Sequence, residues 1–413
     1  MTITSYPELV RISGSGNTVG FGGSTVDAFG RLRVSQPYTL FDSQNRYSID
    51  PQFSTSTAGS GAVTHLSNES SVNMAVSTTS GDEVVRQTFR VFPYQPGKSL
   101  LLLATFKMDT AKTNLRQRVG YFNTGNGVYL EQGANGITFV LRTSTSGSVD
   151  NSRYVVKASW NGDKLDGTGA SGVTLDLTKT QIMFMDFEWL GVGSVRCGFV
   201  INGQFIVCHT FHNSNIQTAV YMTTAILPVR YEITNTGTVA SSSAMKQICS
   251  SVMSEGGYEA VSAELSARRT SILSTISTTF LPLVSIRLNS SRQGAVVLPN
   301  RMSVLPTTNQ NYEVALVKNA TLTSASYVTG SFDNVDYDVS ATAMSGGTIM
   351  QSDYVTSSTQ GRATLAAPTG YNFDLQLGVS LAGVSDVYTI AIRTVSGATS
   401  GDAFGSLTFY DLT

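Results

Sequence analysis

The segment VRCGFVINGQFIVCHT, residues Val195–Thr210, decides the fold class of this chain. Two runs rich in β-branched and aromatic residues, Val195–Ile201 and Gln204–Thr210, flank the dipeptide Asn202-Gly203. Asn-Gly strongly favours a two-residue turn with positive φ at both positions, which is the turn that joins antiparallel strands. The segment therefore predicts a β-hairpin, across which Cys197 and Cys208 could face each other.

The same pattern recurs on both sides of this hairpin. From Val63 to about Tyr258, many short apolar or alternating runs are separated by Gly, Asn and Asp turns. Leu100–Met108 is apolar on both faces, as a central strand is, and Val84–Val91 alternates. In that segment one face carries Val85, Gln87, Phe89 and Val91, and the other carries Val84, Arg86, Thr88 and Arg90. We expect two packed sheets, a β-sandwich over residues 52–258.

A second series of strand patterns begins at about Phe280 and continues to Thr413. It predicts another β-sandwich over residues 280–413. The segment between them, 259–279, holds the best helix candidate of the chain, Ala263–Arg269, and is expected to be a linker. Residues 1–51 are expected to form an extended N-terminal arm. The predicted fold class is all-β, with two sandwich domains of lectin-like or jelly-roll-like type and that arm.

Charge is scarce and balanced, because only 13% of residues are charged and 27 Lys and Arg oppose 28 Asp and Glu. This balance gives no basic field for nucleic acid, and no apolar run reaches the roughly 18 residues of a membrane span. Few charges are available to protect exposed strand edges, which favours burial of those edges in a homo-oligomer. The first residues show no secretory signal, so synthesis in a cytoplasm is expected.

The stretch GFGGSTVDAFGRLRVSQPYTLFDSQNRYSIDP, Gly20–Pro51, concentrates the charged and aromatic residues of the N-terminal part. Its glycines and Pro37 favour an irregular, mostly extended backbone. The apolar anchors are Leu32, Val34 and Phe41, and the cations Arg31, Arg33 and Arg46 could pair with Asp27, Asp42 and Asp50. Such an arm lies either on its own domain or on a neighbouring subunit, and the residues alone leave both possibilities open.

Within this stretch, Asp27–Ser35, Pro37, Thr39–Ser43 and Tyr47 resemble a signature near the N-terminus of virion structural proteins of tailed bacteriophages. Shorter stretches resemble the same proteins farther along the chain: Glu255–Tyr258, Ile286–Leu288 and Val335–Val339. The order of Trp160–Asp163, Phe184–Trp189 and the Asn202-Gly203 hairpin resembles the concanavalin-type lectin sandwich. These resemblances imply a virion component with a lectin-like domain, but a fold does not by itself assign a function.

Few residues have the spacing that catalysis or metal binding requires. His209 and His212 lack a third zinc ligand, and polar residues at a strand end are the favoured interpretation. Asp186 and Glu188 would share one strand face, as paired glycosidase carboxylates do, but an acid bonded to Arg196 is favoured. Two sets of turn oxygens could bind calcium, although turn hydrogen bonds explain them equally well: Asn161, Asp163 and Asp166, and Asp333, Asp336 and Asp338. We therefore expect no catalytic, cofactor-binding or metal-binding residues.

The sequence favours a non-enzymatic structural component of a phage virion, made in the host cytoplasm. Its expected partners are further copies of itself, a trimer being one arrangement, and other virion proteins; no nucleic acid and no membrane insertion are expected. The predicted assembly contacts are Arg31, Arg33, Phe41 and Asp42. The alternative is a lectin-like fibre module that recognises host surface glycans through Trp160, Asn161 and Asp163, with Trp160 exposed. Polysaccharide hydrolysis by Asp186 and Glu188 is a third hypothesis.

Overall fold

In the computed structural model, described in full for residues 36–259, 262–356, 373–395 and 400–413 and as backbone for 10–14, 17–21 and 363–365, strands dominate. The described residues form no α-helix, only three short 3-10 turns: η2 (Ser67–Glu69), η3 (Lys157–Ser159) and η4 (Phe373–Leu375). Within them, no helix is long and apolar enough to cross a membrane. The all-β prediction is confirmed.

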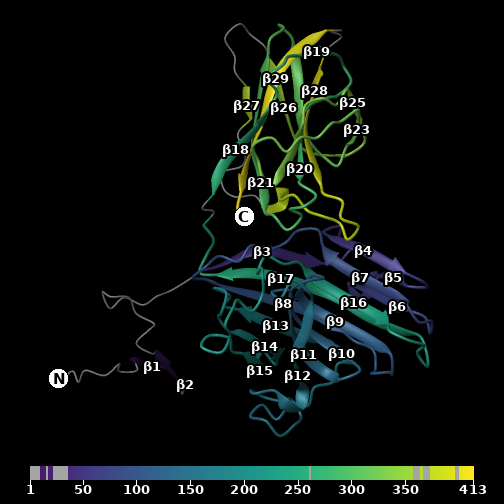
Figure 1. Cartoon of the computed structure of the whole chain (residues 1–413), viewed down its shortest axis with the longest axis vertical. Coiled ribbons are helices and arrows are strands. Elements are labelled where there is room, and N and C mark those ends of the chain that lie inside the picture. Colours follow the sequence, from purple (N-terminus) through teal and green to yellow (C-terminus); the bar gives the residue numbers. More distant parts are fainter. Residues whose placement is uncertain are drawn as a thin grey trace, which may run out of the picture.

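The first sandwich packs a seven-stranded sheet against an eight-stranded sheet (Figure 1). The seven-stranded sheet has the order β12 (Asp150–Val156), β11 (Gly136–Thr143), β10 (Gly127–Gly133), β9 (Leu115–Phe122), β16 (Val229–Asn235), β7 (Glu83–Thr88) and β4 (Phe53–Ala58). The eight-stranded sheet has the order β15 (Gln204–Phe211), β14 (Val195–Ile201), β13 (Gln181–Phe187), β8 (Ser99–Lys107), β17 (Ser243–Glu255), β6 (Ser71–Val76) and β5 (Ala62–Leu66). One apolar core fills the space between them.

The eighth strand of that sheet, β3 (Pro37–Gln44), comes from the predicted N-terminal arm. It pairs antiparallel with the second half of β17, beyond the residues that pair with β6. A register shift at Leu40 places both Leu40 and Phe41 in the core, where the Phe41 ring contacts those of Phe53 and Phe92. This part of the arm is therefore a strand of its own domain.

The second sandwich is built from two five-stranded sheets around a separate core. One sheet has the order β18 (Ala263–Arg268), β29 (Gly401–Asp411), β21 (Val297–Pro306) and β27 (Ala363–Leu365), and β19 (Leu273–Ile276) also pairs with β29. The other has the order β24 (Val335–Asp338), β20 (Leu281–Leu288), β28 (Val387–Thr394), β22 (Asn311–Lys318) and β26 (Thr348–Thr356). Two small two-stranded sheets complete the described strands: the hairpin of β1 (Val10–Gly14) and β2 (Asn17–Phe21), and the pair of β23 (Thr321–Thr323) and β25 (Ala343–Ser345).

The helix predicted at Ala263–Arg269 is wrong. This segment forms β18, which pairs with β29, and the nearby β19 also pairs with β29. Helix propensity is a weak preference that pairing with a long neighbouring strand readily overrides. The segment 259–279, predicted as a linker, thus supplies two strands to the second sandwich.

Candidate functional site

The two sandwiches meet in a packed junction, with the second standing end-on against the first (Figure 1). Val296, Leu298 and Phe373 of the second sandwich belong to the apolar core of the first. Polar contacts fix the same junction: Arg90 Nη1 donates to the Phe373 carbonyl at 2.6 Å, Gln376 Nε2 to the Val91 carbonyl at 2.8 Å, and Val379 N to the Phe89 carbonyl at 2.8 Å. Groups at this junction are therefore held in fixed positions.

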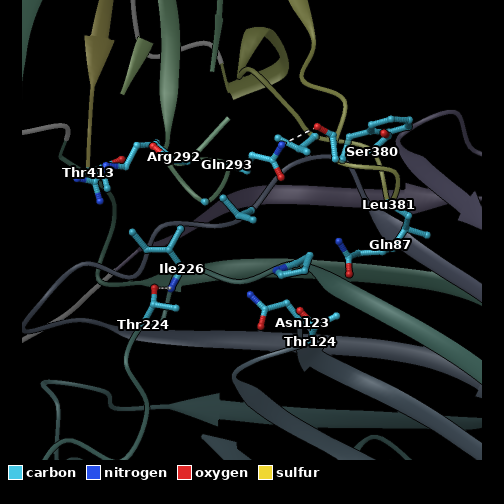
Figure 2. Close-up of a pocket in the computed structure, with 18 of the residues that line it drawn as sticks. Gln87, Asn123, Thr124, Thr224, Ile226, Arg292, Gln293, Ser380, Leu381 and Thr413 are labelled. Atoms are coloured by element: carbon cyan, nitrogen blue, oxygen red, sulfur yellow. Dashed lines mark hydrogen bonds between the residues drawn. The ribbon is translucent and has the colours of Figure 1, made fainter. Parts of the chain in front are cut away.

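Beside these contacts lies an open cavity of about 500 Å³ (Figure 2). Figure 2 shows that Gln87, Asn123 and Thr224 come from the strands and loops of the first sandwich, whereas Arg292 and Ser380 come from loops of the second. The volume lies within the usual range of small-molecule sites, which often form at domain interfaces. The polar lining residues are Gln87, Asn123, Thr124, Thr224, Arg230, Ser291, Arg292, Gln293, Asn334, Ser380 and Thr413.

The lining contains two arginines and neither Asp nor Glu. Arg230 is occupied, because it binds both Glu232 and the Oε1 of Gln87. The exposed Arg292 guanidinium has no partner among the described residues. Arg292 therefore gives the rim an unpaired positive charge, while the Asp411 carboxylate behind the lining accepts from Asn334 Nδ2 and Thr413 N.

Sequence reasoning missed this cavity, although the alternation of Val84–Val91 held part of the signal. It predicts Gln87 and Phe89 on one strand face, and both line the cavity. The opposite face, with Arg86 and Arg90, is turned inward. Arg86 is fully buried, its Nε donates to Gln247 Oε1 at 2.6 Å, and burial lowers the pKa of Arg86 to about 10.

Along the strands of the seven-stranded sheet, side chains point alternately into the core and onto the outer face of the sheet, which is turned away from the core. On that outer face Phe122, Tyr129 and Val140 form a small cluster of their own. Arginines stack on its rings, with the Arg142 guanidinium carbon 5.1 Å from the centroid of Tyr129 and that of Arg230 5.5 Å from the centroid of Phe122. The arginines thus cover apolar rings, while their guanidinium groups donate to neighbouring side chains and carbonyls of the same sheet.

Glu232 is the central residue of an ion-pair network on this outer face. It binds Arg116, Arg118 and Arg230 at 3.0 to 3.2 Å, and Arg118 also binds Glu131 at 2.7 Å. Burial alone would raise the pKa of Glu232, but the three arginines outweigh it and hold the pKa below its usual value. The face is a connected ion network and not a set of separate surface charges.

The predicted glycan contacts have structural roles. The prediction that Trp160 is exposed is wrong: only 2% of it is exposed, and its ring stacks on Phe139 with 4.8 Å between centroids. Asn161 makes two side-chain hydrogen bonds to the backbone of Thr210, and Asp163 accepts from the backbone of Leu165 and Ser171. The loop covers the edge of β15, so these groups are occupied within the fold.

Asp186 and Glu188 lie on one face of the strand region, as predicted, and both line an open cavity of about 630 Å³. Asp186 is buried and bonded to Arg196, the role that the sequence favoured, whereas Glu188 is exposed. The two carboxylates therefore lie in different environments, one held by an arginine and the other in solvent.

The predicted metal candidates form no cluster of three His, Cys, Asp or Glu in the part of the chain that the structure describes. His209 is buried, and burial together with nearby His212 lowers the pKa of His209 to about 4. Cys197 and Cys208 are buried free thiols. A bulge in β15 pairs His209 with Cys197 and makes Cys208 the extra residue, and both cysteines lie in the same apolar core.

The predicted assembly contacts divide into three groups. Arg31 and Arg33 lie outside the described residues. Phe41 is only 2% exposed and packs in the core of its own domain, so its expected contact with another chain is wrong. Asp42 is exposed on β3 and is free to meet a partner.

No protein-family model matches the sequence, and no curated protein matches it significantly. Solved structures match at low identity. They include the Emp47p carbohydrate recognition domain (10% identity, 58% of this chain and 100% of that one, TM-score 0.31) and the CBM2 module of the evolved Dit of Lactobacillus casei BL23 phage J-1 (6%, 55% and 100%, 0.37). A family 16 glycosyl hydrolase protein of Mycobacterium smegmatis also matches (11%, 52% and 100%, 0.33). The three matches comprise a carbohydrate recognition domain, a phage Dit module and a glycosyl hydrolase protein.

Proposed function

We propose that this protein is a non-enzymatic structural component of a phage virion that assembles as a homo-oligomer through strand edges and its N-terminal residues. The observation that carries the proposal is strand β26, at the edge of a five-stranded sheet of the second sandwich. An edge strand presents unpaired backbone groups, which proteins usually protect with lysine, proline or a covering segment.

Apart from a bulge at Met350, strand β26 has little of this protection. Its nine residues include one charged side chain, Asp353, and no proline or lysine. Ile349, Met350 and Tyr354 are 51%, 38% and 67% exposed, respectively. A long, nearly uncharged edge with apolar side chains on both faces is a surface suited to pairing with another chain.

The N-terminal residues support the same proposal. Figure 1 places the hairpin of β1 and β2 apart from both sandwiches. A two-stranded hairpin alone is marginally stable in water, so packing on another chain would stabilise it. The resemblance of the adjoining segment to phage virion proteins gives this assembly its proposed setting.

Light scattering behind a sizing column tests the proposal directly. We expect the purified chain to form a discrete oligomer, and Ile349→Lys to shift it toward monomer by placing a charge on the β26 edge. Val149→Lys is the matched control, because Val149 is 52% exposed in a loop of the first sandwich. A monomeric wild-type chain, or an oligomer unaffected by Ile349→Lys, would contradict assembly through this edge.

A second function, recognition of host surface glycans, is favoured by the cavity at the junction of the sandwiches. Its many amide and hydroxyl side chains suit a ligand rich in hydroxyl groups. In this proposal the cavity replaces the loop at Trp160 as the glycan site. Binding of simple sugars to the whole chain tests it, as described below.

A further inference from the structure

We propose that the cavity at the junction of the two sandwiches is a site for an acidic saccharide, whose carboxylate binds Arg292 and whose ring packs on Phe89. This inference rests on the second proposed function, glycan recognition, and names its ligand class.

Phe89 provides the ring platform. It follows directly after β7, is half-buried and lines the cavity. It belongs to none of the apolar clusters formed by the described residues, unlike the neighbouring Phe92. An aromatic side chain that no core uses, at the wall of a polar cavity, can pack against the apolar face of a sugar ring.

Unused amide groups provide the hydrogen bonds. Gln87 uses its Oε1 for Arg230, and Asn123 uses its Oδ1 for two backbone N–H groups of its own turn. The amide nitrogens of both side chains have no partner among the described residues. Opposite them, Gln293 Nε2 donates to Gly383 and Asn334 Nδ2 donates to Asp411, which leaves the side-chain oxygens of Gln293 and Asn334 as acceptors. Donors on one wall and acceptors on the other match hydroxyl groups, which both donate and accept.

Charge selects the acidic member of this ligand class. Arg230 is neutralised by Glu232, but Arg292 has no acidic partner among the described residues, and no Asp or Glu lines the cavity. A guanidinium matches the two oxygens of a carboxylate in geometry as well as in charge. A neutral sugar would leave this interaction unused.

Contacts across the junction hold the two walls at a fixed separation. Val379 N donates to the Phe89 carbonyl at 2.8 Å, and Leu381 N donates to Ser54 Oγ at 3.0 Å. The loop that carries Ser380 is thereby attached to the first sandwich on both sides of that residue. A cavity with walls already ordered loses less entropy when a ligand binds.

The test compares two sugars that differ only at C6, D-glucuronate and D-glucose. Saturation-transfer NMR and titration calorimetry on the whole chain measure their binding. We expect D-glucuronate to bind more tightly than D-glucose. Arg292→Gln should lower affinity for D-glucuronate about tenfold and leave D-glucose unchanged, whereas Phe89→Ala should weaken both sugars about fivefold. Arg46→Gln is the matched control, because Arg46 is exposed on the first sandwich, away from the cavity lining.

The outcomes separate this inference from the function on which it rests. If neither sugar binds at millimolar concentration, both the inference and glycan recognition are refuted. If both sugars bind equally and only Phe89→Ala weakens them, glycan recognition stands and the acidic ligand class is refuted. If inorganic phosphate displaces D-glucuronate with equal affinity and Phe89→Ala has no effect, the cavity is an anion site and the inference is refuted.

Discussion

Replacing Phe41 by alanine separates two roles for the N-terminal segment, one within its own domain and one between subunits. The Phe41 ring lies 4.9 Å from that of Phe92 and 5.9 Å from that of Phe53, centroid to centroid. The Arg90 guanidinium carbon lies 5.6 Å from the centroid of the same ring. With only 2% of Phe41 exposed, truncation leaves a cavity in a closed core.

The magnitude follows from this burial. Buried Phe→Ala changes lower the free energy of unfolding by about 3–5 kcal/mol, as lost transfer energy plus the cost of the cavity. For a domain of this size each kcal/mol lowers the melting temperature by about 2–4 °C. We therefore expect Phe41→Ala to lower the melting temperature of the first sandwich by roughly 6–20 °C. This loss of stability should be accompanied by little change in the mass of the folded protein in solution.

Differential scanning calorimetry measures the shift, and light scattering on the same samples measures the mass. Asp42→Ala is the matched control, since Asp42 is the exposed neighbour on the same strand and surface changes usually stay within about 0.5 kcal/mol. A loss of stability below about 1 kcal/mol in Phe41→Ala, together with a smaller particle mass, would refute the placement of Phe41 in its own core.

Three further predictions concern other parts of the chain. Since the pKa of His209 is lowered to about 4, its neutral form stabilises the fold; this stability is complete above about pH 6.5 and lost as pH falls toward 4. We expect the free energy of unfolding to fall between pH 7 and pH 4.5 by about 2 kcal/mol less in His209→Phe than in the wild-type chain, as measured by urea unfolding. An equal fall in the two proteins would contradict this prediction. Glu232→Ala should cost about 3–5 kcal/mol in the same assay, because three arginines, of which Arg118 and Arg230 are buried, lose their shared partner. Glu69→Ala, which breaks a more exposed pair, should cost less than about 1 kcal/mol. Phe373→Ala should split thermal unfolding into two calorimetric transitions by loosening the junction, and one unchanged transition would show that other contacts couple the sandwiches.

Local signals predicted the strands well wherever turn chemistry and alternation agreed. Asn202 and Gly203 have positive φ of 52° and 75°, as their dipeptide predicts, and the flanking strands are β14 and β15. The same hairpin also shows the limit of local reasoning. A two-residue turn with regular pairing would oppose Cys197 to Cys208, but a bulge moves His209 into that place. A bulge depends on packing against the other sheet, and a single strand does not encode that packing.

The inward or outward direction of a strand face was harder to predict, because both faces of several strands are covered. In β7 the face with Arg86 packs inside, where Gln247, Thr55 and the ring of Phe53 surround the guanidinium. Burial of the Arg86 charge is unexpected only when the strand is considered alone. Its partners lie on other strands, and Gln247 is 161 residues away along the chain.

The candidate site could not be predicted from the sequence either, because it also depends on contacts between distant parts of the chain. Its walls come from segments that are distant in sequence and belong to two sandwiches, so no motif spacing connects Phe89 with Arg292 or Asn334. Only the structure shows that the Phe89 ring lies outside every core cluster of the described residues and that the Arg292 guanidinium has no acidic partner among them. A ligand that contacts both groups would use the ring and the charge together. The paired comparison of D-glucuronate and D-glucose is decisive because it tests the charge and the ring separately.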